Sequence, residues 1–458
     1  MSQLMVGLLQ ATATHIPLRA ESVQCIVTSP PYWSLRSYQG EQRQTWGGDP
    51  RHEHHFEALP TAEGYTGTAR WQHSNNGRGE EAPDEKRLRD PVSRYARPEA
   101  WGQIGHGGLC ACGAWRGSLG LEPLFDCLAW ARGEPPCAAC YVCHIRVVFA
   151  ELWGVLRSDG TCWLNLGDSY TSGNRPDTVP DTLGATRSAA NRRPRTPLKP
   201  KDLIGVPWRV ALALQTDGWW LRSDIVWAKP NPMPESVTDR PTKSHEYVFL
   251  LTKSARYFYD ADGVRETAIH AVKEVHTNGN DGMDAGYDGN RTRDGFRRGV
   301  VVGSHRNVRS VWTIPTQAYP GSHFATFPAA LAERCVLAGT SPRACGVCGS
   351  PWARTVERIG HVNRREPAHV PGRSPTKTDS TGWKPTSRPS GDWHATCEHS
   401  DDGGSAHCVV LDPFVGSGTV ARVAIQHGRS VVGLDISREY LADHARRRVD
   451  KIQVEMGL

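Results

Sequence analysis

The chain contains 458 residues, of which 38% are hydrophobic and 22% are charged, and its formal net charge is +6. This length allows one large domain with insertions or two to three domains. No run approaches the roughly 18 to 20 apolar residues that a membrane-spanning helix needs, so the composition excludes a protein of that class. The first residues lack the pattern of a secretory signal, and we expect a cytoplasmic protein. The basic excess is compatible with a polyanionic partner or with an ordinary solvated surface.

The first informative segment reads Val-Thr-Ser-Pro-Pro-Tyr-Trp and follows a predicted buried strand at residues 23–27. Two consecutive prolines, Pro30 and Pro31, fix φ and donate no backbone hydrogen bond, so the loop is stiff. Ser29 Oγ and the Pro30 carbonyl remain as acceptors, and Tyr32 offers a flat face to a planar ring. Because ligands bind at the carboxyl ends of strands in open α/β sheets, this loop suits an aromatic amine. An ordinary turn after a strand is the structural alternative.

Four polar segments interrupt the ordered parts of the chain, at residues 39–108, 171–200, 268–308 and 360–406. They lack apolar periodicity and are rich in turn-forming residues, so we interpret them as insertions. Between them, strand-like runs alternate with amphipathic stretches, as a doubly wound α/β sheet requires. The predicted helical stretches are Val147–Leu156, Pro207–Gln215 and Ala329–Ala338.

The chain contains 13 cysteines, which a cytoplasmic protein rarely uses as disulfides. Tetrahedral zinc takes four sulfur or nitrogen ligands, and cysteine pairs that converge across a loop can supply them. One predicted site combines Cys110, Cys112, Cys137 and Cys140, with Cys143 as the substitute ligand. A second predicted site combines Cys345, Cys348, Cys397 and His399. Buried or surface thiols are the alternative for both groups, and Cys408 is either a core residue or a substitute ligand.

A glycine-rich turn near the C-terminus follows an apolar strand at residues 409–412 and precedes a helix at 420–427 and a strand at 430–435. The glycines let the backbone approach a ligand closely, and an acidic residue that ends the second strand can accept both hydroxyls of a ribose. This pattern favours a nucleoside-type cofactor over a plain structural turn. The residues assigned to the cofactor site are Asp412, Pro413, Phe414, Gly416, Ser417, Gly418, Thr419 and Asp435.

Together, Ser-Pro-Pro-Tyr at 29–32 and Asp-Pro-Phe-Val-Gly-Ser-Gly-Thr at 412–419 resemble the two motifs of the DNA methyltransferases that act on exocyclic amino groups. The resemblance implies that the first motif is catalytic and that the second binds S-adenosylmethionine. Residues 159–168, 217–227 and 245–251 resemble later strands of the family, in family order. The segment that begins at residue 323 resembles the part of the family that holds the methionine end of the cofactor, through His323, Phe324 and Thr326.

The catalytic motif precedes the cofactor motif, an order that marks the beta group of this family. The resemblance therefore implies an α/β, circularly permuted Rossmann-like methyltransferase fold with long polar insertions and zinc-binding loops. The implied divisions are 1–38, the N-terminal catalytic part; 39–146, a Cys-rich insertion; 147–260, the continued catalytic core; 261–310, a target-recognition insertion; 311–344, a cofactor-binding segment; 345–407, a zinc-knuckle-like insertion; and 408–458, the cofactor-binding β-α-β unit.

The implied activity is site-specific methyl transfer from S-adenosylmethionine to double-stranded DNA. Ser-Pro-Pro-Tyr is commoner in the N4-cytosine enzymes of the family and Asp-Pro-Pro-Tyr in the N6-adenine enzymes, so cytosine is favoured and adenine is the alternative. The target base must leave the duplex, with Tyr32 and Trp33 stacked against it. Arginines of the recognition insertion would contact phosphate or guanine, with a solvated loop as the alternative. They are Arg291, Arg293, Arg297 and Arg298. A cognate restriction endonuclease is a candidate partner.

Three other interpretations compete with this one. The dipeptide Pro136-Cys137 is of the type that attacks a ring carbon in a different class of DNA methyltransferase, but it lies inside the cysteine array. Methylation of RNA or of a protein glutamine usually goes with Asn-Pro-Pro-Tyr after the cofactor motif, the reverse of the order here. A catalytically inactive zinc-containing DNA-binding protein is the third, although Ser29, Tyr32, Asp412 and the glycines are all present.

Overall fold

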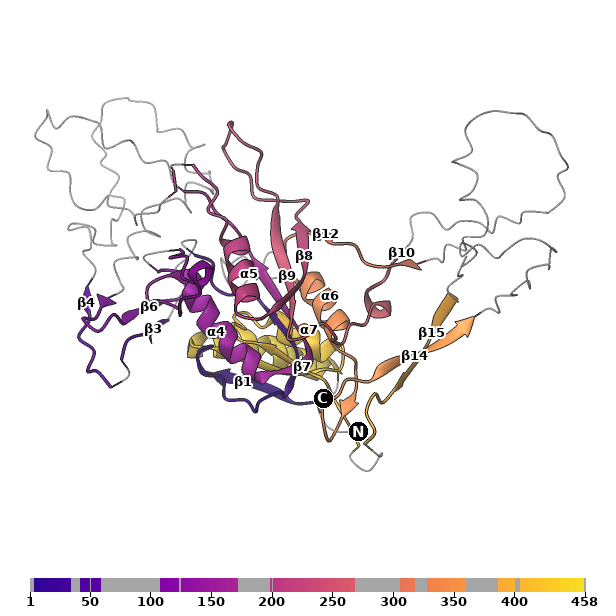
Figure 1. Cartoon of the computed structure of the whole chain (residues 1–458). Coiled ribbons are helices and arrows are strands. Elements are labelled where there is room, and N and C mark those ends of the chain that lie inside the picture. The colour runs from indigo at the N-terminus through magenta and orange to yellow at the C-terminus, as the bar shows by residue number, and fades with distance from the viewer. Residues whose placement is uncertain are drawn as a thin grey trace, which may run out of the picture.

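An eight-stranded sheet forms the centre of the computed structural model (Figure 1), which describes residues 4–33, 42–49, 51–58, 108–122, 125–171, 198–199, 201–267, 305–317, 328–359, 386–399 and 404–456. The strand order is β1-β18-β17-β2-β7-β9-β8-β12. In that order the strands are Val6–Gln10, Ser430–Asp435, Val409–Asp412, Val23–Thr28, Leu156–Leu166, His245–Thr252, Trp220–Ala228 and Val311–Thr313. The C-terminal part of the chain therefore places β17 and β18 between β1 and β2.

Strand direction decides which loops meet. Neighbouring strands are parallel except at β9, which is antiparallel to both β7 and β8. The carboxyl ends of β2, β7, β17 and β18 consequently lie at one edge of the sheet, and the amino end of β9 lies at that same edge. All six residues of β2 are buried, as expected for a strand that is covered on both faces.

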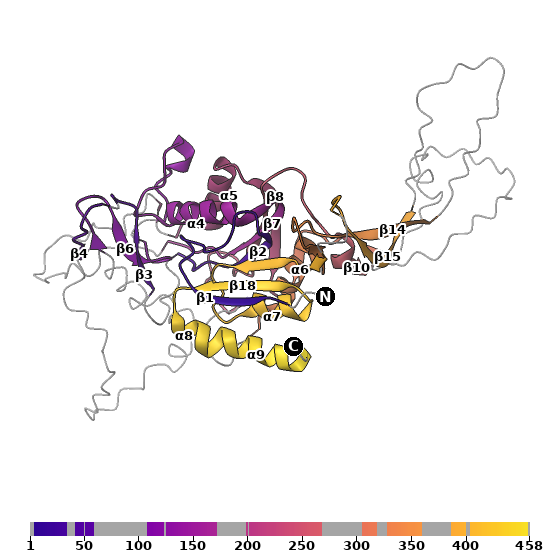
Figure 2. The ribbon, with the colours of Figure 1, turned by 90° about the horizontal axis from the view of Figure 1, so that it is seen from below.

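Helices cover both faces of the sheet, as Figure 2 shows. Helices α4 and α5 pack on one face, and α6, α7 and α9 pack on the other. Because side chains alternate along a strand, Ile26 of β2 joins the first core, whereas its neighbours Cys25 and Val27 join the second. The helices are α4 (Tyr141–Val155), α5 (Val206–Thr216), α6 (Ala329–Gly339), α7 (Thr419–Gln426) and α9 (Arg447–Met456). The short α8 (Arg438–Tyr440) and the π-helical turn η7 (Leu441–Arg446) lead into α9.

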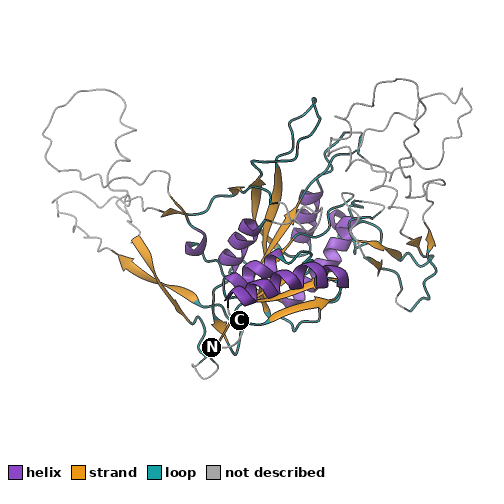
Figure 3. Cartoon of the chain, turned by 180° about the vertical axis from the view of Figure 1, so that it is seen from behind, coloured by secondary structure: helices purple, strands orange, loops and turns teal. Residues whose placement is uncertain are grey.

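Smaller units lie at the two sides of this body (Figures 1 and 3). A four-stranded sheet lies near the amino end of α4, and the hairpin of β14 and β15 projects on the opposite side. The four-stranded sheet contains β3 (Arg43–Trp46), β6 (Trp115–Ser118), β5 (Gly108–Leu109) and β4 (Glu57–Ala58). The remaining pairs are β10 (Glu266–Thr267) with β11 (His305–Arg306), β13 (Ala344–Cys345) with β16 (Ser405–Ala406), and β14 (Ala353–Ile359) with β15 (Thr386–His394). Two 3-10 turns are η2 (Trp130–Arg132) and η4 (Asp262–Val264).

The predicted mixed α/β architecture is confirmed in the described residues. The three predicted helical stretches fall in α4, α5 and α6, although α4 begins at Tyr141, six residues before its predicted start. Most of each predicted polar insertion lies outside the described residues. Within the described residues, no helix has both the length and the apolar character needed to cross a membrane.

Candidate active site

The two motifs singled out in the sequence open into one cavity. Strands β2 and β17 pair in parallel, with Cys25 opposite Val410 and Ile26 opposite Leu411, so the loops that follow them leave the sheet side by side. The cavity between them measures about 310 Å³. Its lining includes Ser29, Pro30, Pro31, Tyr32, Asp412, Pro413, Phe414, Gly416, Ser417, Thr419 and Asp435.

The two glycines of the second motif have different surroundings. Both have left-handed backbone, with φ +46° at Gly416 and +76° at Gly418. A Cβ added at Gly418 would lie 2.9 Å from the Ala445 backbone, so this glycine allows close packing of the helical C-terminal segment. Among the described residues outside its chain neighbours, a Cβ added at Gly416 would have one atom within 4 Å, Phe414 O at 3.8 Å, and Gly416 lines the cavity. Gly416 is therefore the glycine that leaves room for a ligand.

Two carboxyl groups, the buried one of Asp412 and the partly buried one of Asp435, brace this glycine loop. Asp412 Oδ1 accepts hydrogen bonds from Thr28 Oγ1 at 3.2 Å and from the backbone N–H of Phe414 at 3.1 Å. Asp435 accepts from the backbone N–H of Ser437 at 2.8 Å and of Gly416 at 3.2 Å. Burial raises the pKa of Asp412 to about 7 and that of Asp435 to about 6, although these hydrogen bonds act in the opposite direction.

The Tyr32 hydroxyl is the centre of a hydrogen-bond network on the other side of the cavity. Ser29 Oγ donates to it at 3.2 Å. The hydroxyl itself lies 2.7 Å from Glu246 Oε2 and 2.8 Å from Asn165 Oδ1, both of which can accept its proton. A Cβ at Gly167 would lie 2.7 Å from the Tyr32 ring, so the glycine lets the ring pack against the end of β7. The ring is thus held at its hydroxyl end and along one side.

Glu246 carries the charge of this network. Burial on its own would raise the pKa of Glu246, but the adjacent ammonium of Lys229 and the hydrogen bonds from Tyr32 and Asn165 outweigh burial and hold the pKa below its ordinary value. Lys229 Nζ also lies 4.4 Å from the centre of the Trp227 ring. Sequence reasoning missed Asn165, Lys229 and Glu246 as site residues. The available signal was their position in or just beyond strands whose ends share one edge of the sheet.

Contacts with Tyr141, Glu122 and Phe125 also hold the catalytic-motif loop and the residue that follows it. The Pro31 carbonyl accepts a hydrogen bond from the Tyr141 hydroxyl at 2.9 Å. Trp33 is only 3% exposed, packs edge-on against Phe125 with ring centres 5.5 Å apart, and donates from Nε1 to the Glu122 carbonyl at 3.1 Å. The prediction that Trp33 stacks on a base is therefore wrong, because its ring is already buried in the protein core.

Several predicted site residues lie outside the described residues. They are His323, Phe324 and Thr326 of the cofactor segment, and Arg291, Arg293, Arg297 and Arg298 of the recognition insertion.

The cysteines form a different pattern from the first predicted metal site. Cys110 and Cys112 lie with His52 and His54, whereas Cys137 and Cys140 lie with Cys127 and Cys143. The predicted combination of Cys110, Cys112, Cys137 and Cys140 is therefore wrong. The first pair belongs to the four-stranded sheet and the second to the amino end of α4, so each pair has its partners in its own unit. The His-x-His spacing at residues 52–54 was the sequence signal that we did not use.

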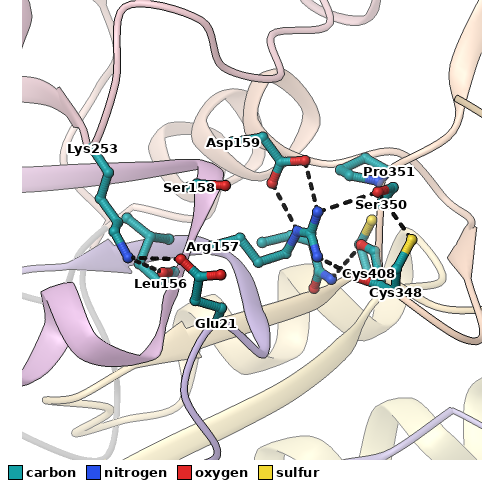
Figure 4. A network of polar contacts seen from close by, with 12 residues as sticks. Glu21, Leu156, Arg157, Ser158, Asp159, Lys253, Cys348, Ser350, Pro351 and Cys408 are labelled. Atoms are coloured by element: carbon teal, nitrogen blue, oxygen red, sulfur yellow. Dashed lines mark hydrogen bonds and ion pairs between the residues drawn. The ribbon is translucent and has the colours of Figure 1, made fainter. Parts of the chain in front are cut away.

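The second predicted metal group does converge. Cys345, Cys348, Cys397 and His399 place one ligand atom each within 4.8 Å of the others. The turn at residues 345–349, called the knuckle below, is closed by the Gly349 N–H, which donates to the Cys345 carbonyl at 2.9 Å. Figure 4 shows how Arg157 fixes this turn: its guanidinium donates to the Cys348 carbonyl and, in a bidentate pair, to Asp159.

This knuckle lies at the edge of the sheet opposite the cavity. Gln24, at the amino end of β2, donates to the Gly349 carbonyl at 2.8 Å and accepts from the Val409 N–H at 2.7 Å. Cys408 is not among its ligands: it is buried, and its Sγ lies 3.6 Å from Ser341 Oγ. A metal at the knuckle would therefore act on the fold and not within the cavity.

Comparison with known proteins places the chain in a family. The family model described as DNA methylase matches residues 138–345 and 405–446. The Type II methyltransferase M.Cfr9I of Citrobacter freundii is 40% identical over 300 residues, which cover 65% of this chain and 68% of that one. The Type II methyltransferase M.SmaI of Serratia marcescens is 38% identical over 311 residues, which cover 68% of this chain and 74% of that one.

Among solved structures, the PvuII DNA methyltransferase (cytosine-N4-specific) aligns over 98% of this chain and 92% of its own, with 12% identity and a TM-score of 0.43. The TM-score of this overlay is too low to support an inference about function. The family-model match and the two relatives do support one: this chain belongs to the DNA methylase family of S-adenosylmethionine-dependent methyltransferases that act on exocyclic amino groups.

Proposed function

We propose that this protein is a site-specific DNA methyltransferase that transfers a methyl group from S-adenosylmethionine to N4 of cytosine. Methylation of N6 of adenine is the second candidate, because both amines present two hydrogens to the same acceptors. The observation that carries the proposal is the single cavity of about 310 Å³ lined by both the 29–32 loop and the 412–419 loop. Donor and acceptor of the methyl group can meet there.

The second motif fits the cofactor. Asp435 is positioned by two backbone N–H groups and has lone pairs left to accept ribose hydroxyls. Gly416 leaves the adjoining space open, and Phe414 gives the cavity an apolar wall. When bound, S-adenosylmethionine supplies an electrophilic methyl group on a sulfonium. His323, Phe324 and Thr326 are proposed to contact its methionine end.

The first motif fits the target amine. An exocyclic amino nitrogen is a poor nucleophile, because its lone pair is delocalised into the ring. Ser29 Oγ and the Pro30 carbonyl are proposed to accept one hydrogen bond each from the two amino N–H groups. This favours tetrahedral geometry at the nitrogen and directs its lone pair toward the methyl group. No covalent intermediate with the enzyme is needed.

A chain of hydrogen bonds prepares Ser29 for this role. Lys229 keeps Glu246 ionised, and the charged carboxylate is the stronger acceptor for the Tyr32 hydroxyl proton. The Tyr32 oxygen then accepts the proton of Ser29 Oγ. With its hydrogen directed at the Tyr32 oxygen, Ser29 Oγ has its lone pairs free to accept from the substrate. Glu246 and Lys229 are therefore positioning residues, which act on Ser29 through Tyr32.

Recognition of DNA follows the family resemblance. The target base is proposed to be flipped out of double-stranded DNA and to stack on Tyr32, and residues 261–310 are proposed to read the site. The motif order supports a circularly permuted, beta-group enzyme. Relatives are Type II methyltransferases, and a cognate restriction endonuclease is the proposed partner.

We also propose a structural zinc ion at Cys345, Cys348, Cys397 and His399. The four ligand atoms lie within 4.8 Å of one another, and four protein ligands leave no open position for chemistry. Cys348→Ser should lower the zinc content of the purified protein by one ion per chain. An unchanged zinc content would contradict this site.

The function is tested by expressing the protein in cells that lack DNA methylation. Mass spectrometry of nucleosides from their DNA should detect N4-methylcytosine, and long-read sequencing should place it at one recurring sequence. Cells that express Ser29→Ala at equal level are the matched control. N6-methyladenine in place of N4-methylcytosine would select the second candidate, and the absence of any modified base would refute the proposal.

A further inference from the structure

Four thiols converge at the amino end of α4. Cys127 Sγ lies 3.5 Å from Cys143 Sγ and 3.6 Å from Cys140 Sγ, and Cys137 Sγ completes a group within 4.8 Å. A disulfide would require a separation of about 2.05 Å. A tetrahedron with zinc–sulfur bonds of about 2.3 Å has edges of about 3.8 Å, close to the separations observed. The arrangement is that of four ligands around one ion.

A second group of four ligands lies in the neighbouring small sheet. It contains His52, His54, Cys110 and Cys112, and their ligand atoms also lie within 4.8 Å of one another. His54 Nδ1 is 3.3 Å from Cys112 Sγ, close to the edge of about 3.5 Å expected between nitrogen and sulfur ligands of zinc. The turn is closed by the Gly113 N–H, which donates to the Cys110 carbonyl at 2.8 Å.

The four-stranded sheet that carries the second group needs such support. It has two strands of four residues and two strands of two residues. Strands this short gain little stability from pairing, and closed metal sites commonly supply the missing stability in small units. One ligand set is all cysteine and the other pairs two cysteines with two histidines; both sets suit zinc and leave no position for a substrate.

The four-cysteine group is joined directly to the catalytic-motif loop. Cys140 and Cys143 flank Tyr141 in the first turn of α4. Tyr141 is fully buried, and its hydroxyl donates to the Pro31 carbonyl at 2.9 Å. An ion bound by the two cysteines would therefore fix the helix turn that holds Pro31.

A second connection runs through His144 on α4. Its Nε2 lies 2.7 Å from the Ala138 carbonyl, beside the ligand Cys137, and its Nδ1 lies 2.9 Å from Glu122 Oε1. Rings from the small sheet stack on it, Trp46 at 4.0 Å and Trp115 at 5.3 Å between ring centres.

Glu122 completes this connection to the loop. Its carboxylate accepts from the Gly120 N–H, and its carbonyl accepts from Trp33, the residue after Tyr32. A Cβ at Gly120 would lie 3.0 Å from the Tyr32 carbonyl, so the two segments are in close contact.

We propose that one zinc ion binds Cys127, Cys137, Cys140 and Cys143, that another binds His52, His54, Cys110 and Cys112, and that both ions hold the 29–32 loop in place. Zinc binding itself is independent of the proposed function. The expected effect of the loop's position on the methyl-transfer rate rests on the proposed function, because only that proposal assigns the loop to methyl transfer.

Metal content tests the two sites in the full-length protein purified under reducing conditions without added metal. Elemental analysis should find one zinc ion for each group, in addition to any ion at the knuckle. Cys137→Ser and Cys112→Ser should each remove one ion. Cys408→Ser is the matched control, because this buried cysteine lies outside all three groups and beside polar partners that can accommodate a hydroxyl; it should remove none.

Wild-type protein without zinc, or with iron in its place, would overturn the metal assignment, and so would unchanged zinc content in either variant. Cobalt substitution of the wild-type protein gives a readout that requires no variant. The four-cysteine site should then produce strong thiolate-to-cobalt absorption, and the absence of such absorption would refute that site.

Tyr141→Phe tests the connection to the loop without touching a metal ligand. It should lower the methyl-transfer rate about threefold to tenfold, the usual effect of one lost hydrogen bond, while zinc content and S-adenosylmethionine affinity stay unchanged. An unchanged rate would overturn the bracing role. If the wild-type protein bound zinc but methylated no DNA, the proposed function and the bracing role would fail together, and the zinc sites would stand.

Discussion

The two sides of the cavity are built in different ways. The side proposed to bind the cofactor, called the cofactor side below, comes from one continuous unit, β17-α7-β18. Much of its bracing is internal: the Gly416 N–H donates to Asp435, and the Val415 N–H donates to the Leu434 carbonyl at 2.9 Å. The side proposed to hold the target base, called the target-base side below, has a loop of four residues whose partners come from distant segments. These partners are Tyr141, Asn165 and Glu246.

This difference indicates how each side should respond to mutation. A side held by its own backbone should fail when the backbone is changed locally, and it should tolerate changes elsewhere. A side assembled from distant side chains should lose rate in steps as its partners are removed one at a time. Cofactor affinity and methyl-transfer rate measure the two sides separately.

Gly416→Val should have the largest effect. The backbone has φ +46°, which a β-branched residue rarely adopts, and the new side chain would occupy space that lines the cavity. We expect S-adenosylmethionine affinity, measured by calorimetry, to fall at least about 100-fold, equivalent to about 2.8 kcal/mol. Gly428→Val controls for backbone strain, since Gly428 has φ +69°, no atom of the described residues lies within 4 Å of its Cβ position, and it does not line the cavity. Equal affinity in the two variants would contradict the assignment of Gly416.

Ser29→Ala should lower the rate without changing cofactor affinity. The substitution removes one of the two acceptors proposed for the amino hydrogens, and losing one positioned polar group at a reacting centre costs on the order of 100-fold in rate. Single-turnover kinetics on methylatable DNA would measure this. A variant with the wild-type rate would exclude Ser29 from the catalytic role.

Glu246→Gln should have a smaller effect on the same side. The amide keeps the shape of the side chain but removes the charge that attracts the Tyr32 proton and pairs with Lys229. We expect a rate about tenfold lower, the value of roughly 1.4 kcal/mol for a weakened charged hydrogen bond. The matched variant Glu235→Gln removes another partly buried ion pair, with Arg240, outside the cavity lining and should keep the rate. Similar losses in the two variants would point to a general electrostatic effect.

The same contrast explains what the sequence could predict. The β17-turn-α7-β18 unit is local, and the strand, glycine turn, helix and acidic residue appear in order within residues 409–435. Asn165 and Glu246 are 81 residues apart, and they meet only because β9 runs antiparallel to β7, with Leu166 opposite Tyr247. Periodicity within a strand does not specify the direction of its neighbour.

The metal groups and Trp33 also show that local patterns are predictable and that contacts between distant segments are not. The knuckle was predicted because each of its halves carries a local signal, the Cys-x-x-Cys pair at 345–348 and the Cys-x-His pair at 397–399, although the halves lie far apart in the chain. The partners of Cys110 and Cys112 lie more than 50 residues earlier, at His52 and His54, in a segment whose composition indicated only a polar insertion. Trp33 was misassigned because its burial depends on Phe125 and Glu122, which belong to a distant part of the chain.

Asp412→Asn should change the stability of the protein in a pH-dependent way. Asp412 is 4% exposed, and burial, together with the nearby charge of Asp435, raises its pKa from 3.8 to about 7. A carboxyl whose pKa is raised by folding favours the folded state while it is protonated. That contribution is complete below the unfolded pKa and is lost as the pH rises through about 7.

The amide that this substitution introduces would stay neutral, and its oxygen can still accept from Thr28 and from the Phe414 N–H. We therefore expect the free energy of unfolding to rise by about 1 to 2 kcal/mol at pH 8 and by roughly a third as much at pH 5, a discounted share of the 1.36 kcal/mol per pKa unit. Denaturant titrations of the cofactor-free protein at both pH values measure this difference. Asp443→Asn, at an exposed aspartate of η7, should show no such pH dependence. A variant that loses equal stability at both pH values would show that Asp412 is needed as a charged hydrogen-bond acceptor, and that the local bracing of the cofactor side carries no cost from a buried charge.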